Sequence, residues 1–228
     1  MAVQQRRLAG LGSHLAAASN AAAASLEALE PLDVRLGPWL QRPTVDSVTV
    51  LWETTGDADG AVVLAETERV HTRNTSLRSP LGPSAHDGLV VGGRHASSAG
   101  SEERTVTEPG RRRSHRVTVS GLQPDTDYNY YVRSSDGSAT IESSWSPCGT
   151  ARPAGTPFAF SVCSELGGSF PMHQASIFTQ IGRHRPDFLV LVGDVVSEGT
   201  TTSDWSRELL DPGRELFART PFYLVPGK

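Results

Sequence analysis

Phe188-Leu189-Val190-Leu191-Val192-Gly193-Asp194 is a run of apolar residues that leads into a glycine and then a carboxylate. An unbroken apolar run of this length, bounded by Pro186 and Gly193, predicts a strand that is buried on both faces, which favours a parallel sheet. In parallel sheets, ligands bind beyond the carboxyl ends of the strands. We therefore expect Asp194 to stand where binding or chemistry takes place.

Further strands and helices are predicted on both sides of this run, within residues 156–228. A buried strand is expected at 158–163 and another strand at 222–225, with helices at about 173–184 and 205–210. Strands that alternate with helices through right-handed crossovers make a three-stranded parallel sheet. Such a small sheet leaves an open edge and an uncovered face, so we expect this segment to be less stable than the rest of the chain.

The preceding segment, residues 34–152, has the pattern of an antiparallel β-sandwich. Alternating apolar and polar residues predict strands at 48–52, 61–65, 116–119 and 128–132. Gly121 and Pro124 predict a turn before the last of these strands, which begins with Tyr128. A tyrosine at this place can bond through its hydroxyl to the backbone of the preceding corner, as in other β-sandwiches.

Two polar segments interrupt the predicted sandwich. Residues 72–112 are rich in Gly, Ser, Pro and Arg, and a loop of that length in a compact domain indicates an insertion or a mobile region. The run Arg111-Arg112-Arg113-Ser114-His115-Arg116 is either a solvated edge that leads into the next strand or a site for a polyanion. We favour the solvated edge, because such charge runs are usually surface features.

Composition and the N-terminus narrow the classes of function. A net charge of -4 and a pI of about 6.0 give no electrostatic basis for binding nucleic acid or an anionic membrane. Residues 1–33 are Ala-rich and have the outline of a signal peptide, the alternative being a fraying helix or disordered leader. The glycosylation sequon at Asn74 would matter only if the chain is secreted. Cys148 and Cys163 would form one disulfide at most, and the sequence leaves compartment and oligomeric state open.

Residues in the first segment resemble the N-terminal domain of purple acid phosphatases. The resemblance lies in Gly37-Pro38-Trp39-Leu40-Gln41-Arg42-Pro43-Thr44, in Val48-Thr49-Val50-Leu51-Trp52-Glu53-Thr54 and in Gly121-Leu122-Gln123-Pro124-Asp125-Thr126-Asp127-Tyr128. It implies a fibronectin type III-like sandwich over residues 34–152. With the parallel-sheet segment, the expected fold class is an α+β multidomain chain.

The second segment resembles the N-terminal part of a calcineurin-like metallophosphoesterase domain. Gly193-Asp194 matches the Gly-Asp motif in which the aspartate bridges two metals. The resemblance implies a binuclear centre of Fe with Zn, Mn or Fe that hydrolyses phosphate monoesters. A bridging carboxylate suits such a site because it can hold two ions about 3.5–4 Å apart.

Several residues depart from this family pattern. Glu165 stands where the family has an aspartate, and Ser197 stands where purple members have an iron-binding tyrosine. Pro226-Gly227-Lys228 stands where Gly-Asn-His is expected, and a phosphate loop at 164–169 is not supported because no G-x-G-x-x-G is present. The candidate metal ligands are therefore Asp194 and Glu165, which would not hold both metals alone. Two hypotheses follow: a metallophosphoesterase that is C-terminally incomplete, or a non-catalytic binding module or inactive fragment.

Overall fold

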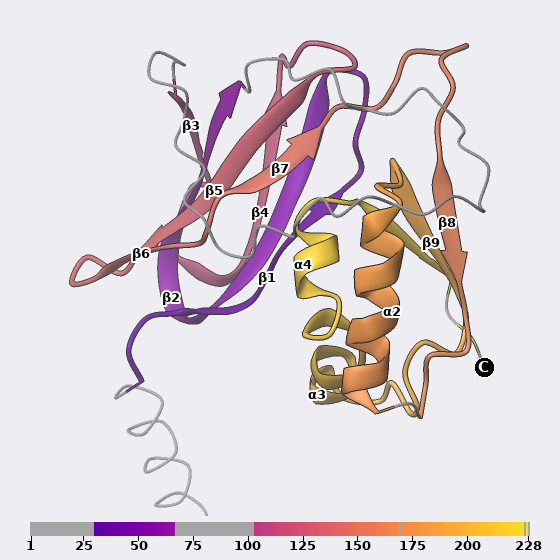
Figure 1. Ribbon diagram of the computed structural model, residues 1–228. Coiled ribbons are helices and arrows are strands. Elements are labelled where there is room, and N and C mark those ends of the chain that lie inside the picture. Colours follow the sequence, from indigo (N-terminus) through magenta and orange to yellow (C-terminus); the bar gives the residue numbers. More distant parts are fainter. Residues whose placement is uncertain (1–29, 67–102, 169, 226, 228) are drawn as a thin grey trace, which may run out of the picture.

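The computed structural model describes residues 30–66, 103–168, 170–225 and 227. An antiparallel β-sandwich is followed by a smaller lobe in which helices cover a parallel sheet, which confirms the predicted fold class (Figure 1). Most of the Ala-rich leader, the sequon at Asn74 and much of the predicted insertion lie outside the described residues. Within the described part, no helix has the length and apolar character needed to cross a membrane.

One long strand, β2, is shared by the two sheets of the sandwich. The strands are β1 (Val34–Gln41), β2 (Ser47–Glu66), β3 (Glu103–Thr107), β4 (Arg112–Ser120), β5 (Asp127–Ser135), β6 (Thr140–Glu142) and β7 (Ser146–Gly149). The first part of β2 pairs with β1 and β4, and its last part pairs with β3 and β5.

Two boundaries predicted for the sandwich are wrong. The strands expected at 48–52 and 61–65 are one strand, because the residues between them stay extended across a register shift between Glu53 and Ala58. The insertion expected at 72–112 is too long, because β3 falls within it and pairs with β2 through Ala61–Ala65. Pairing with a neighbouring strand thus overrides the weak local signal of β3.

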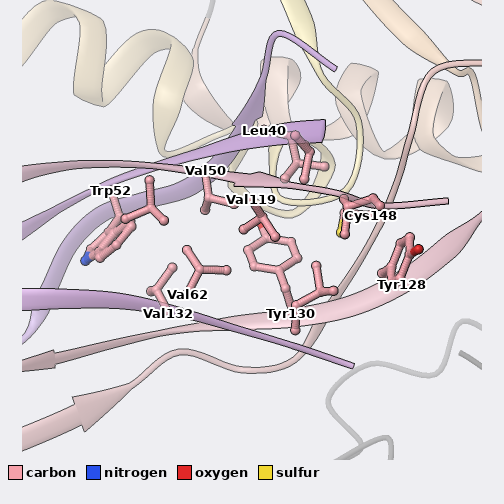
Figure 2. Packing of buried hydrophobic residues seen from close by; sticks show 13 residues of the cluster. Leu40, Val50, Trp52, Val62, Val119, Tyr128, Tyr130, Val132 and Cys148 are labelled. Carbon is pink, nitrogen blue, oxygen red and sulfur yellow. The ribbon is translucent and has the colours of Figure 1, made fainter. Parts of the chain in front are cut away.

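Alternate side chains of the strands fill the space between the two sheets, as the sequence pattern predicts (Figure 2). The buried cluster includes Leu40, Val48, Val50, Trp52, Val62, Leu64, Val117, Val119, Tyr128, Tyr130, Val132 and Cys148. The predicted tyrosine corner is confirmed: the backbone N–H of Gln123 donates to the hydroxyl oxygen of Tyr128 at 2.9 Å. Trp52 is fully buried, and its indole N–H is satisfied by Ser134 Oγ at 2.9 Å.

The arginine-rich run is a solvent-facing strand, as expected, but one of its residues is buried. Arg112, Ser114 and Arg116 alternate outward along β4, whereas His115 points into the sandwich. The His115 ring stacks on Trp52 with a centroid distance of 4.6 Å. Its Nδ1 lies 3.3 Å from a carboxylate oxygen of Glu108. Outward arginines on β4 also discourage pairing with foreign strands.

The second lobe contains the predicted three parallel strands in the order β10-β9-β8. Its elements are β8 (Phe160–Cys163), α2 (Pro171–Arg183), β9 (Phe188–Val192), α3 (Thr202–Trp205), the π-helical turn η1 (Ser206–Leu210), α4 (Arg214–Phe217) and β10 (Phe222–Val225). The second helical stretch begins earlier than the predicted 205, because Thr201 and Asp204 form a capping box at the start of α3.

The helices bury only one face of the parallel sheet. Leu189 and Leu191 of β9 lie under them, and the ring of Phe217 packs on Phe222 at a centroid distance of 4.3 Å. In Figure 1, α2 and α4 lie between the sandwich and the parallel sheet. The buried face of the sheet therefore looks toward the sandwich, and the other face looks away from it.

The prediction that 188–193 and 158–163 are buried on both faces is wrong for the described residues. On β8, Phe160 is 53% exposed and Val162 is 59% exposed. Every second side chain of these strands points away from the helices, and no described element covers them. Among the described residues, one face of the three-stranded sheet is therefore uncovered, as expected.

The sandwich and the lobe are joined by packing and by hydrogen bonds. Trp39 of β1 packs against the apolar core of the lobe, and α4 lies beside β1. The hydrogen bonds across this boundary include Gln41 Nε2 to Phe222 O (3.0 Å), Tyr130 Oη to Ala218 O (2.7 Å) and Arg152 Nε to Asp187 Oδ1 (2.9 Å). The parallel sheet is thus held at a defined place relative to the sandwich.

Candidate functional site

The two candidate metal ligands follow neighbouring parallel strands. Asp194 comes after β9 and Glu165 after β8, and both residues are exposed at the carboxyl ends of these strands. Both have left-handed backbone conformations, with φ of +49° at Asp194 and +56° at Glu165. Positive φ is uncommon for residues other than glycine, and it is concentrated where loops serve a function. Arg42, Asp125 and Arg185 share this conformation, so the backbone geometry is consistent with a functional role for Glu165 and Asp194 without identifying it.

The loops that carry these two residues touch each other. The backbone N–H of Gly167 donates to the carbonyl oxygen of Asp194 at 2.7 Å. A Cβ at position 167 would lie 2.7 Å from the carbonyl oxygen of Val196, closer than side-chain atoms approach backbone. Gly167 is therefore required for the close contact between the loop after β8 and the loop after β9.

Ser197, at the position where the resemblance places an iron-binding tyrosine, connects three parts of the lobe. Its Oγ accepts a hydrogen bond from the backbone N–H of Gly168 at 2.7 Å. Its own N–H and hydroxyl donate to the same carboxylate oxygen of Glu208, at 2.7 and 2.8 Å. Ser197 therefore ties both strand-end loops to η1, where Glu208 lies.

Glu208 is a buried carboxylate that sequence reasoning missed. Its second oxygen accepts from Arg207 at 2.8 Å, and this hydrogen bond, followed by those from Ser197, lowers the pKa of the Glu208 carboxyl. An ionised Glu208 can accept all of these bonds. In the sequence, only the neighbouring Leu209 indicates that Glu208 lies near the core, because Leu209 is on the buried side of the same turn.

A second missed polar group lies below the loop after β8. The side chain of Gln174 in α2 is fully buried, and its Nε2 donates to the carbonyl oxygen of Leu166 at 2.8 Å. Its Oε1 has no hydrogen-bond partner among the described residues. Gln174 thus supports the residue that follows Glu165, but its sequence context on an otherwise amphipathic helix gave no signal of this.

The third strand brings a glycine against Asp194. Gly227 follows β10, and a Cβ at this position would collide with the carboxylate and the backbone nitrogen of Asp194. The resemblance places an asparagine ligand at this point of the chain. Gly227 provides no side-chain ligand. Its backbone instead packs closely against Asp194.

The described residues do not fit a complete binuclear metal centre. Asp194 and Glu165 offer carboxylate oxygens, which hard cations prefer. In the described parts of the chain, however, no group of three or more His, Cys, Asp and Glu side chains gathers in one place. Two-metal sites need more ligands than two carboxylates supply. Asp194 and Glu165 alone therefore do not make up the donor set of such a site.

Comparisons with known proteins agree with this architecture. The family described as "Purple acid Phosphatase, N-terminal domain" matches residues 33–152. The structure of the purple acid phosphatase PPD1 from yellow lupin (Lupinus luteus) seeds is similar to this chain with a TM-score of 0.56 and 16% sequence identity. A structure of PhoD is similar with a TM-score of 0.50 and 14% identity. No curated protein sequence matches the chain.

The structural similarity extends beyond the sandwich. The lupin structure is matched over 85% of this chain and the PhoD structure over 87%, so each match includes part of the parallel-sheet lobe. The matched regions are 36% and 40% of those two chains. The chain therefore spans well under half of the length of either structure.

Proposed function

This chain belongs to the family defined by the purple acid phosphatase N-terminal domain, and on that premise we propose that it is the sandwich and strand-end part of a phosphatase for phosphate monoesters. In this proposal the sandwich positions the parallel sheet through the bonds from Gln41 and Tyr130. The sheet in turn presents Asp194 and Glu165 at its carboxyl end. Hydrolysis of phosphate monoesters would require further metal ligands in addition to Asp194 and Glu165.

One observation carries the proposal. The loops after β8 and β9 are bonded to each other between Gly167 N and Asp194 O at 2.7 Å, so their carboxylate-bearing residues are held at one edge of the sheet. This edge is where parallel sheets bind ligands. Asp194 and Glu165 would be this chain's share of the ligands for a metal pair such as Fe with Zn, Mn or Fe.

A second candidate function is a non-catalytic binding module. This candidate is favoured by the hydrogen bonds of Ser197 with Gly168 and Glu208, because these bonds give the strand-end loops a structural role. In this case the sandwich would carry the binding surface, and the lobe would support it. The two candidates differ in whether Asp194 contributes to metal affinity.

Titration of the purified chain with Mn²⁺ and Zn²⁺, followed by calorimetry and elemental analysis, tests the proposal. We expect weak binding of less than two metal ions, reduced at least tenfold by Asp194→Asn, with little turnover of p-nitrophenyl phosphate. Asp57→Asn removes an exposed carboxylate on the sandwich and is the matched control. Equal metal affinity of both variants would favour the non-catalytic module. Two tightly bound ions, with turnover lost on Asp194→Ala, would show that the chain completes the site by itself.

A further inference from the structure

A buried carboxylate in the second lobe is connected to both strand-end loops, although it lies in neither of them. Glu208 is in η1, and its side chain is 8% exposed. One of its oxygens, Oε2, accepts from the N–H and the hydroxyl of Ser197 at 2.7 and 2.8 Å. The other oxygen, Oε1, accepts from Arg207 at 2.8 Å. Both oxygens of Glu208 thus have protein partners, which fixes the orientation of the carboxylate.

Ser197 extends this connection to the loop after β8. The Ser197 hydroxyl has one proton, which it donates to Glu208, so the carboxylate also sets the direction in which the lone pairs of Oγ point. One of these lone pairs accepts from the N–H of Gly168 at 2.7 Å. Without its acceptor the hydroxyl would be free to rotate, and the bond from Gly168 would weaken. The connection therefore runs from Glu208 to Ser197 and from there to Gly168.

The two bonded positions have the same spacing from the two candidate ligands. Ser197 is three residues after Asp194, and Gly168 is three residues after Glu165. The backbone at both candidate ligands is left-handed, a conformation that is unfavourable for residues with a side chain and persists where surrounding contacts hold it. The bonds of Ser197 with Glu208 and Gly168 are contacts of this kind.

Glu208 approaches the loops from an uncommon helical turn. In η1 the N–H of Asp211 donates to the carbonyl oxygen of Ser206 at 2.8 Å, which is the wide spacing of a π-helix. Glu208 and Leu209, adjacent in this turn, are both buried. Single π-helical turns are rare and occur frequently at functional sites. The local backbone is therefore consistent with a role for Glu208 at such a site.

We propose that Glu208 is a positioning residue for the candidate site: through Ser197 it holds the loops that carry Asp194 and Glu165 in the arrangement that binds a cation. This proposal rests on the proposed function, because it concerns the same two carboxylates. Glu208 is not itself a ligand in it, since both of its oxygens accept hydrogen bonds from protein groups. Replacing a residue that orients a metal ligand lowers metal affinity by roughly tenfold or more, although that residue does not touch the metal.

Hydrogen exchange of single amides in the metal-free, full-length chain tests whether Glu208 holds the loops. Glu208→Leu removes the acceptor at similar side-chain size and should speed exchange at Ser197 and Gly168 by about tenfold. Glu208→Gln keeps a carbonyl oxygen that can accept from Ser197 and should retain most of the protection. Glu215→Leu makes the same change at an exposed glutamate of α4 and should leave both amides as in the wild type.

Electron paramagnetic resonance of free Mn²⁺ measures cation binding by the same variants. Glu208→Leu should weaken binding by roughly tenfold, whereas Glu208→Gln and Glu215→Leu should bind nearly as the wild type does. Glu208→Gln removes the same charge as Glu208→Leu but keeps the acceptor for Ser197. The two variants therefore separate positioning of the loops from long-range attraction of the cation by the carboxylate.

Circular dichroism shows whether each variant is folded. If Glu208→Leu fails to fold, Ser197→Ala replaces it and should speed exchange at Gly168 alone, because the N–H of residue 197 still donates to Glu208. Unchanged exchange at Gly168 in either variant would overturn the proposal. A folded Glu208→Leu chain with wild-type Mn²⁺ affinity would overturn it as well, and so would an equal loss of affinity in Glu208→Gln.

Failure of the proposed function would give a different result. Asp194→Asn would then bind Mn²⁺ as the wild type does, because the carboxylate would not be a ligand. Exchange at Ser197 and Gly168 would still become faster in Glu208→Leu, since these amides report on the loops without any metal. The two measurements therefore distinguish an error in the role of Glu208 from an error in the site itself.

Discussion

The hydroxyl of Tyr130, in the middle of the sandwich core, donates a 2.7 Å hydrogen bond to the backbone carbonyl of Ala218 in the second lobe. The tyrosine is fully buried, and burial raises the pKa of its phenol well above the ordinary value. The hydroxyl therefore stays protonated and remains a donor. This bond connects the sandwich to the segment between α4 and β10.

Tyr130→Phe should lower the free energy of unfolding by about 1–3 kcal/mol, because the carbonyl of Ala218 would be left buried without its donor. The loss should appear first in the lobe, as a separate early phase in denaturant unfolding followed by near-ultraviolet circular dichroism. Tyr128→Phe is the control, since its hydroxyl bonds to Gln123 inside the sandwich. A Tyr130→Phe variant with wild-type stability and one cooperative transition would contradict this coupling.

The parallel sheet should open more readily than the sandwich. Within the described part of the chain, β8 and β10 are edge strands and one face of their sheet is exposed, whereas β2 is paired on both sides and buried. Native-state hydrogen exchange at low protein concentration should show weaker protection for amides of β8 and β10 than for those of β2. Equal protection in the two parts would contradict this expectation.

His115 should make folding stability depend on pH. Burial is the largest influence on this imidazole and lowers its pKa, while Glu108 and, more weakly, Asp59 oppose the shift and Arg112 adds to it. The unfolded chain therefore takes up a proton near pH 6.5 that the folded chain does not yet bind. Stability should fall as the pH drops from about 6.5 through the lower folded-state pKa.

Urea unfolding of His115→Gln at several pH values measures this contribution. The variant should be less stable at neutral pH, because the ring that stacks on Trp52 is lost. Its stability should change less than that of the wild type between about pH 7 and about pH 5, on either side of the ordinary histidine pKa. His173→Gln changes an exposed histidine and should keep the wild-type pH dependence. The same dependence in all three proteins would exclude His115 as its source.

Gly167→Ala should separate the two strand-end loops. The added Cβ would press on the carbonyl of Val196, and the bond from Gly167 N to Asp194 O would lengthen or break. Overpacking of this kind costs about 1–3 kcal/mol, measurable by thermal unfolding. Gly56→Ala is the control, since a Cβ at Gly56 meets no atom within 4 Å. Equal stability of the two variants would show that the loops tolerate the side chain.

The sequence predicts the sandwich well where side chains alternate strongly. Val48, Val50 and Trp52 all lie in the core, and Tyr128 makes the corner bond expected from its place after Gly121 and Pro124. These predictions succeed because period-two patterning and turn residues are local properties. The three parallel strands of the second lobe follow equally well from the alternation of strands and helices.

Other features depend on distant partners and could not be predicted. The extended course of β2 past Gly56 is stabilised by β4, and the exposure of Val162 depends on which elements lie over the sheet. Asp194 lies in a motif that the sequence shows directly, whereas the anchoring role of Glu208 arises only when η1 meets Ser197. Long-range contacts of this kind leave no periodic trace in the sequence.

The sharing of β2 by both sheets has a consequence during synthesis of the chain. This 20-residue strand is complete at Glu66, but its partners β4 and β5 end only at Ser120 and Ser135. At ribosomal speeds, β2 waits roughly 2–8 seconds with only β1 beside it until β3 is complete at Thr107, and longer for β4 and β5. During that interval its apolar residues are available to other nascent chains, so the speed of translation should influence how much of the protein escapes aggregation.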